Sequence, residues 1–161
     1  MTLLCLLGTP SSLNRLRREI DDAVAAGQIS SPVIRDAEAI RLPYLQAVIK
    51  ETIRLFPPQT GHNFKQVPAG GATILGFYLP EGTQVGVNIM RLMHDKDKFG
   101  PDAEVFRPER WLEQTDPEKL KDMAATVELV FGHGKFQCLG KTIAFMELNK
   151  IFVEVSPGTY C

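Results

Sequence analysis

Cysteine is scarce in this sequence: among 161 residues there are three, Cys5, Cys138 and Cys161. Their odd number and wide spacing provide neither the paired set of a disulfide framework nor the Cys-x-x-Cys unit of a metal site. The three histidines are not spaced as a zinc-binding pair either. A disulfide scaffold and a cysteine-rich metal site are therefore excluded.

The sequence also lacks an excess of charge of either sign and any long hydrophobic run. Lysine and arginine number 18 and aspartate and glutamate 19, without a long basic stretch, which makes nucleic acid a poor candidate partner. The apolar run within residues 1–10 is too short to span a bilayer and has no basic start or cleavage region of a signal peptide. We expect it to form the last turns of a buried helix whose beginning is missing.

What remains is an ordinary globular composition with helical patterns in the first third. Hydrophobic residues make up 44% of the chain, enough for one compact domain with a core. Helices are predicted over residues 9–27, 31–39 and 43–56, each beginning at or beside a proline, whose missing N–H is not needed in a first turn. On the third helix Glu51 and Arg54 share a face. From the residues alone they predict a surface ion pair of little energetic value.

The composition changes after the third predicted helix. Residues 61–86 are rich in glycine, proline and β-branched residues, which predicts short strands separated by turns. A short helix is predicted over residues 87–94, irregular structure over 99–112 and a solvated connection over 115–126. A last helix, over residues 139–154, ends before Ser-Pro-Gly at 156–158.

The candidate functional site is the stretch from Phe131 to Gly140, which reads Phe-Gly-His-Gly-Lys-Phe-Gln-Cys-Leu-Gly. Its glycines allow backbone angles closed to other residues and let the loop lie flat against a ligand. Cys138 stands at the mouth of the last predicted helix, where the macrodipole and the free amides of Leu139 and Gly140 favour an anionic sulfur. The stretch therefore predicts a thiolate that acts as a ligand or a nucleophile.

This loop resembles the haem-binding loop of the cytochrome P450 family, whose pattern is Phe-x-x-Gly-x-Arg-x-Cys-x-Gly. The matching positions are Phe131, Gly134, Cys138 and Gly140. The position of the arginine holds Phe136, and a positive charge stands one residue earlier, at Lys135.

Three further elements resemble the family in its own order: the Glu-x-x-Arg helix at residues 51–54, the glycine- and proline-rich strands, and Pro-Glu-Arg-Trp at residues 108–111. In the family, the glutamate and the arginine of the Glu-x-x-Arg helix form a buried structural cluster with a second arginine from the Pro-Glu-Arg-Trp element. The matching residues here are Glu51, Arg54 and Arg110. A basic residue before a Val-Pro pair there binds a haem propionate. Lys65 is the nearest match, and from the residues alone it equally predicts a solvated lysine on an edge strand.

The resemblance covers nearly the whole chain and implies a mainly α fold with a small β-sheet (α+β). It would be the C-terminal haem-binding part of the cytochrome P450 fold, truncated at both ends, and most similar to microsomal-type members such as the pisatin demethylase-like group. The expected division is helices over 1–58, strands over 59–87, the meander over 88–130, the cysteine haem loop over 131–140, and a final helix with a clipped end over 141–161.

The function that the resemblance implies is that of a haem-thiolate monooxygenase, which inserts one oxygen atom from O2 into an apolar organic substrate. Cys138 would be the axial ligand of haem b iron. Phe131 would pack near the sulfur, Gly134 would allow the porphyrin to approach, and Lys135 would replace the absent arginine at a propionate. No residue is assigned a catalytic role. NADPH would supply electrons through a reductase, and a full-length parent is expected at the endoplasmic reticulum membrane, attached by segments absent here.

Two other hypotheses remain. Family members are much longer than this chain, and their distal helix, with its oxygen-activating acid and threonine, would lie before residue 1. The chain alone would then be a non-catalytic truncated fragment. The other hypothesis is a reactive-thiol or metal site made by His133 and Cys138.

Overall fold

The computed structural model describes residues 1–30, 32–61 and 64–155. Ser31, His62, Cys161 and the predicted helix-breaking residues 156–158 lie outside these ranges. The elements are, in chain order, α1 (Thr2–Gly8), α2 (Pro10–Ala25), α3 (Asp36–Ala39), α4 (Pro43–Leu55), β1 (Lys65–Gln66), β2 (Ala72–Ile74), β3 (Phe77–Leu79), β4 (Gln84–Val85), α5 (Ile89–Met93), α6 (Lys96–Phe99), α7 (Arg110–Glu113), α8 (Pro117–Glu128), the 3-10 turns η1 (Leu129–Phe131) and η2 (Gly134–Phe136), and α9 (Lys141–Glu154). The predicted class, mainly helical with small antiparallel sheets, is confirmed.

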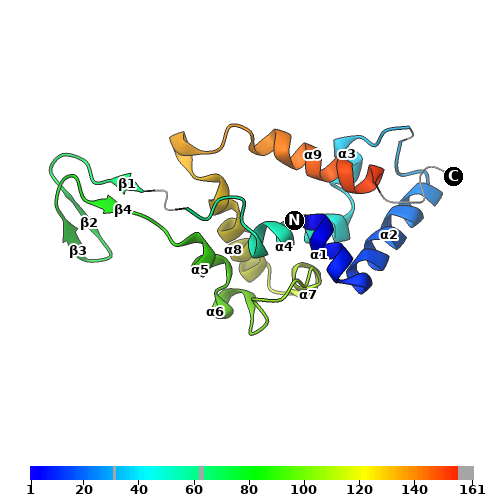
Figure 1. The fold of residues 1–161 in the computed structure, drawn as a ribbon, viewed down its shortest axis with the longest axis horizontal. Helices are drawn as coiled ribbons and strands as arrows, with labels where there is room; N and C mark the ends of the chain where they lie inside the picture. Colours follow the sequence, from blue (N-terminus) through cyan, green and yellow to red (C-terminus); the bar gives the residue numbers. More distant parts are fainter. Residues whose placement is uncertain (31, 62–63, 156–161) are drawn as a thin grey trace.

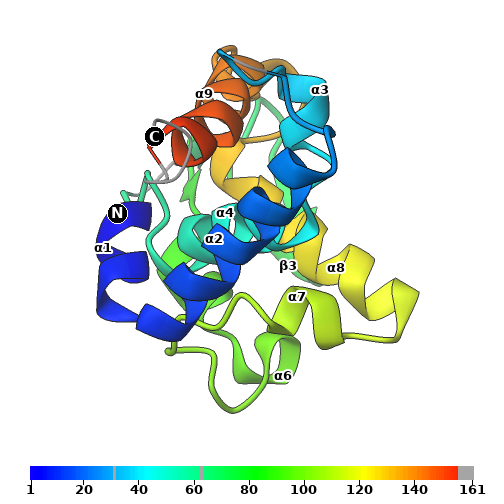
Figure 2. The same cartoon turned by 90° about the vertical axis from the view of Figure 1, so that its right-hand side faces the viewer.

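Helix α4 forms the centre of the body. It is buried over most of its length, and α1, α2, α7, α8 and α9 pack against it (Figures 1 and 2). A helix buried on nearly all sides belongs to the interior of a fold. Its first amide donors are satisfied by Glu19 of α2, whose carboxylate accepts from the amides of Tyr44 and Leu45 over 2.7 and 2.9 Å. The other helices are therefore arranged around α4.

Helix α9, which follows the candidate cysteine loop, is fixed by buried polar contacts. Asn149, 2% exposed, donates from Nδ2 to Asp36 Oδ1 over 2.8 Å and accepts from Gln46 Nε2 over 2.9 Å. One turn later, the Glu154 carboxylate accepts from the amide of Ile34 over 2.7 Å. Because these bonds reach α3, α4 and the segment before α3, they set the rotation of α9 and hence the direction in which the loop leaves it.

A β-hairpin projects from the helical body (Figure 1). Strands β2 and β3 pair antiparallel with Ile74 opposite Phe77, which leaves Leu75 and Gly76 as a two-residue turn. Both turn residues have positive φ, 51° and 83°, as in the type I′ turns that suit hairpins. At the base of the hairpin β1 pairs antiparallel with β4 and returns the chain to the body.

The predicted connection over residues 115–126 is wrong, because this segment contains helix α8. Asp116 caps the helix, its carboxylate accepting from the amides of Glu118 and Lys119 over 3.0 and 3.4 Å. Pro117 stands at the first position, where a proline starts a helix instead of breaking it. Met123 and Val127 are buried against the body. The apolar residues of this segment are spaced as in a helix, but its largely polar composition led to the prediction of a solvated connection.

Two predicted helices are also corrected. Of the predicted helix over residues 31–39, the described residues form only α3. The Glu38 carboxylate accepts from the Ser30 hydroxyl and the Arg35 amide over 2.6 and 3.1 Å, and these bonds compete with a longer helix. The N-terminal run is helical, as predicted, but only one face of it is buried: Leu6 is 2% exposed, whereas Leu4 and Leu7 are 65% and 66% exposed. Among the described residues, no helix has both the length and the apolar character needed to cross a membrane.

Candidate functional site

The candidate cysteine loop is a compact turn between α8 and α9. The amide of Cys138 donates to the carbonyl of Phe131 over 2.7 Å and so closes the loop onto its own beginning. Within it, the amide of Gln137 donates to the carbonyl of Gly134 over 3.0 Å. The Cys138 side chain itself is exposed. The backbone bonds therefore hold the sulfur at the surface in front of α9.

Gly132 carries the tightest turn of the loop. Its φ of 74° and ψ of −176° lie in a region that essentially only glycine occupies. A Cβ at this position would stand 2.6 Å from the carbonyl oxygen of Phe136, far inside van der Waals contact. Gly134 also has positive φ, 60°, but a Cβ there would meet nothing within 4 Å. The loop thus requires glycine at position 132 for its own folding, whereas position 134 opens onto free space.

The residues after Cys138 leave its sulfur accessible. A Cβ on Gly140 would lie 3.9 Å from Cys138 Sγ, so the glycine keeps the space beside the sulfur open. None of the hydrogen bonds seen in the described part of the chain uses the amides of Leu139 or Gly140 as donors. The ring of Phe131 packs on that of Phe145 with centroids 5.4 Å apart and braces the loop against α9. The loop therefore has free donors beside an exposed thiol.

Lysines from two parts of the chain meet on one aromatic ring of this loop. The ammonium of Lys65, on β1, lies 3.5 Å from the centroid of the Phe136 ring, and that of Lys135 lies 5.0 Å from it. Phe136 is 58% exposed. The structure thus brings the predicted propionate candidates Lys65 and Lys135 to the edge of the cysteine loop, although they are far apart in the sequence.

The predicted structural cluster lies in the core, on α4 and α7. Glu51 and Arg54 are fully buried and Arg110 is 3% exposed, so the pair on α4 is no surface ion pair. Arg54 donates to both carboxylate oxygens of Glu51 over 3.0 and 2.9 Å, and Arg110 Nε donates to one of them over 2.9 Å. Trp111 Nε1 and the amide of Arg107 also donate to Glu51, over 2.9 and 3.1 Å. Each lone pair of the buried carboxylate is therefore used.

The guanidinium groups of the cluster fasten the irregular segment after α6. Arg54 donates to the carbonyl of Ala103 in this segment over 2.6 Å and to that of Met93, at the end of α5, over 2.7 Å. Arg110 donates to the carbonyls of Asp102 and Val105 over 2.9 and 3.1 Å. Because this segment has few backbone bonds of its own, these side chains replace the hydrogen bonds that regular structure would provide.

Asp102 completes the cluster. Its carboxylate accepts from Arg110 Nη1 over 2.9 Å and from Arg107 Nε over 2.5 Å. Partial burial opposes ionisation of this group, but the hydrogen bonds from Arg110 and Arg107 outweigh it and hold the pKa of Asp102 below its ordinary value of 3.8.

Acid is therefore expected to loosen the segment that Asp102 holds. Because the pKa is lower in the folded than in the unfolded chain, the stabilisation is complete above 3.8 and is lost as the pH falls further. Urea unfolding between about pH 6 and about pH 2 should show a smaller pH dependence in Asp102→Asn than in the wild type over the acidic part of the range. Asp97→Asn serves as the control. Identical slopes in wild type and Asp102→Asn would contradict the assignment.

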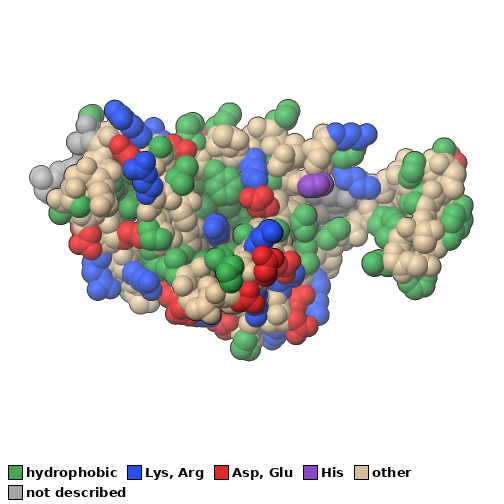
Figure 3. Space-filling view, turned by 180° about the vertical axis from the view of Figure 1, so that it is seen from behind, with side chains coloured by type: hydrophobic (Ala, Val, Ile, Leu, Met, Phe, Trp, Pro, Cys, Tyr) green, Lys and Arg blue, Asp and Glu red, His purple; other side chains and the backbone are tan. Residues whose placement is uncertain are grey.

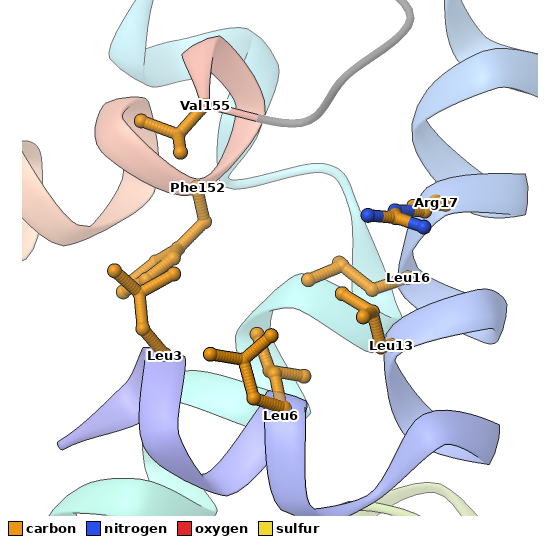
Figure 4. Close-up of a pocket in the computed structure, with 8 residues that line it drawn as sticks. Leu3, Leu6, Leu13, Leu16, Arg17, Phe152 and Val155 are labelled. Atoms are coloured by element: carbon orange, nitrogen blue, oxygen red, sulfur yellow. The ribbon is translucent and has the colours of Figure 1, made fainter.

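A separate apolar cavity of about 170 Å³ lies between α1, α2 and the end of α9 (Figure 4). Leu6, Leu16 and Phe152 are among the residues that line it. Arg17 also lines it, and its buried Nε has no hydrogen-bond partner among the described residues. The described lining residues include no thiol, imidazole or carboxylate. The cavity is therefore not a candidate for the chemistry assigned to Cys138.

A metal site at His133 and Cys138 would need a third ligand, and the described residues provide none. Wherever the structure describes side chains, no three histidine, cysteine, aspartate or glutamate residues gather as metal ligands. Sequence reasoning missed other residues of the loop and cluster: the need for glycine at 132, the indole donor of Trp111, the carboxylate of Asp102 and the ring of Phe136. All four depend on contacts that no local spacing signals.

Comparison with known proteins points in one direction. A family model described as Cytochrome P450 matches residues 1–155. Cytochrome P450 monooxygenase ABA1 of Pyricularia oryzae is 47% identical over 154 residues, covering 96% of this chain and 30% of that protein. The aba1 monooxygenase of Botryotinia fuckeliana is 46% identical, with the same coverage. Pisatin demethylase of Fusarium vanettenii is 41% identical over 155 residues, covering 96% of this chain and 28% of that protein. The chain spans less than a third of the length of these curated relatives.

Proposed function

The chain belongs to the cytochrome P450 family. We therefore propose that it is part of a haem-thiolate monooxygenase and that Cys138 is the axial ligand of the haem iron. The observation that carries the proposal is the placement of this thiol. The backbone amide of Cys138 donates to the carbonyl of Phe131, and its side chain is exposed. The adjacent amides of Leu139 and Gly140 donate no hydrogen bond within the described structure. Such amides stabilise a sulfur anion.

The surroundings of Cys138 fit a flat, largely apolar ligand that carries carboxylates. Phe136, Leu139 and Ile143 are 58%, 100% and 57% exposed, which is unusual for large apolar side chains gathered around one loop. Lys65 and Lys135 stand at one edge of this apolar area. A haem group has the matching chemistry, since its macrocycle is apolar and its two propionates are anionic.

Each residue of the loop then has a defined task. Haem bound through a cysteine thiolate supplies the electron donation that favours O–O bond cleavage. Phe131 braces the loop from behind by its contact with Phe145. Gly134 leaves open space above the loop for the macrocycle, and Gly140 leaves the sulfur unobstructed. Lys65 and Lys135 bind the propionates.

The cluster of Glu51, Arg54 and Arg110 supports this site without taking part in chemistry. It holds the segment between α6 and α7 against α4, on which α9 also packs. Since α9 and α4 share the Asn149–Gln46 bond, the cluster and the cysteine loop are attached to the same helix.

The relatives support a proposal for the activity of the whole protein. We propose insertion of one oxygen atom from O2 into an apolar small molecule, with electrons from NADPH through a reductase and, as in microsomal-type members, a parent protein at the endoplasmic reticulum membrane. The support is that relatives spanning nearly all of this chain are named monooxygenases, and one is named pisatin demethylase. These comparisons do not favour the non-catalytic alternative.

The test is the carbon monoxide difference spectrum of the reduced chain after reconstitution with haemin. A Soret band strongly shifted to the red, typical of thiolate ligation, is expected in the wild type and in Cys5→Ser, and its complete loss in Cys138→Ser. Cys5 is the matched control because it is a free thiol on α1, outside the loop.

Circular dichroism of all three proteins shows whether each is folded. A thiolate-type band that persists in folded Cys138→Ser would overturn the assignment of the ligand. The absence of such a band from the folded wild type would overturn the proposal that this chain holds haem through a thiolate.

A further inference from the structure

Phe136 occupies the position at which the family pattern has an arginine, and a phenyl ring cannot bind an anion. What the ring does bind is cations. Lys65 Nζ lies 3.5 Å from its centroid and Lys135 Nζ 5.0 Å, both within the range in which a ring quadrupole attracts an ammonium group. One lysine comes from β1 and the other from the loop itself.

Both lysines keep their charge free for another partner. Neither forms an ion pair with a carboxylate in the described part of the chain, and residues 131–140 contain no acidic side chain. Basic side chains are grouped where the projecting hairpin joins the body (Figure 3). Two ammonium groups close to one ring repel each other, and the attraction of each group to the π electrons of the ring offsets part of this repulsion. The arrangement is therefore ready for an anionic ligand with more than one charge.

We infer that Phe136 is a positioning residue: its ring holds Lys65 and Lys135 side by side, so that together they bind the two carboxylates of a porphyrin. A lysine pair gathered by an aromatic ring thus takes the place of a single arginine. The inference rests on the proposed function for the identity of the ligand, but the carboxylate clamp does not require iron or the thiolate.

The strand β1 makes this role specific. It consists of Lys65 and Gln66, both exposed, and in the described part of the chain its one pairing partner is β4. The contact with Phe136 is a link between this short strand and the cysteine loop. Without the ring, Lys65 has no described contact that directs its ammonium group to the loop, and a free lysine side chain samples many rotamers.

The experiment is a fluorescence titration of the full chain with metal-free protoporphyrin IX and, separately, with its dimethyl ester. The ratio of the two dissociation constants measures recognition of the carboxylates alone. The wild type should prefer the diacid. Phe136→Leu, which keeps an apolar side chain but removes the ring face, should lower this preference about fivefold, and Phe136→Tyr should restore it.

The lysine variants decide whether the ring acts through the lysines. Lys65→Gln and Lys135→Gln should each lower the preference in the wild-type background and have little further effect in the Phe136→Leu background. Lys150→Gln, on α9, is the matched control and should leave the preference unchanged. A preference in Phe136→Leu equal to that of the wild type, or additive effects of the lysine and ring variants, would overturn the inference.

The outcome is separable from that of the proposed function. Cys138→Ser should keep the diacid preference while losing the thiolate band. A thiolate band without any diacid preference would overturn this inference alone. A diacid preference without a thiolate band would leave the clamp in place and overturn the assignment of Cys138. Thermal unfolding of Phe136→Leu should match that of the wild type, because an exposed ring contributes little to the core.

Discussion

Glu51→Ala is expected to leave the chain unfolded or nearly so at room temperature. The substitution removes the carboxylate that Arg54 and Arg110 share, and both guanidinium groups are buried. Removing one partner of a buried ion pair costs about 3–5 kcal/mol. Here Arg54 loses its carboxylate, and Arg110 keeps only that of the partly exposed Asp102. Since domains are stable by only about 5–15 kcal/mol, this loss consumes a large part of the total. Urea unfolding followed by circular dichroism measures it.

The matched control is Glu104→Gln. Glu104 pairs with Lys96 over 3.8 Å and both side chains are exposed, so the loss should be at most about 1 kcal/mol. Glu51→Gln is expected to fall between the two, because the amide keeps the shape and one acceptor but not the charge. If Glu51→Ala unfolded at the same urea concentration as Glu104→Gln, the cluster would not be what holds the irregular segment on α4.

The cluster also shows where reasoning from sequence stops. The spacing of Glu51 and Arg54 predicts that they share a face of a helix, and they do. It does not predict that this face is buried, because burial depends on Arg110 and Trp111, which lie about sixty residues further along the chain. The resemblance suggested the first of these partners, whereas the indole donor had no signal in the sequence.

Local signals were reliable where a helix has a strong apolar period and poor where its composition is polar. Helices α2 and α4 begin and end within two residues of their predictions. Helix α8 was predicted as a solvated connection, although Asp116 followed by Pro117 is a typical cap and first position. Its buried residues Met123 and Val127 belong to the core that α4 and its neighbours form. Tertiary contacts outweighed the weak local preference.

The loop shows the same division. Its sequence predicts a cysteine at the mouth of the last helix, and in the structure Cys138 lies just before α9. The exposure of its side chain was not predicted. The contact between Lys65 and Phe136 joins residues 71 positions apart, and no pattern within the loop indicates it. Which of the glycines the loop requires also depends on a backbone contact, that between Gly132 and the Phe136 carbonyl.

Gly132→Ala is accordingly expected to disrupt the cysteine loop. The backbone angles at this residue, φ 74° and ψ −176°, cost any other residue about 1–3 kcal/mol. The added methyl group would also stand 2.6 Å from the Phe136 carbonyl, which is backbone and has little freedom to move. We therefore expect a loss of about 3 kcal/mol or more in the unfolding free energy, or a rearranged loop that relieves the strain at the expense of the Phe131–Cys138 bond.

The comparison that isolates this effect is Gly134→Ala in the same loop. Gly134 has φ at 60°, and no atom lies within 4 Å of the added Cβ. The unfolding free energy of this variant should therefore fall by only about 1–2 kcal/mol, the cost of a left-handed backbone for a non-glycine residue. Haemin reconstitution then reports on the loop itself: the thiolate-type Soret band should disappear in Gly132→Ala and persist in Gly134→Ala. Equal loss of the band in the two variants would mean that haem binding depends on glycine flexibility in general. Loss in Gly132→Ala alone would show that one crowded backbone position determines where Cys138 points.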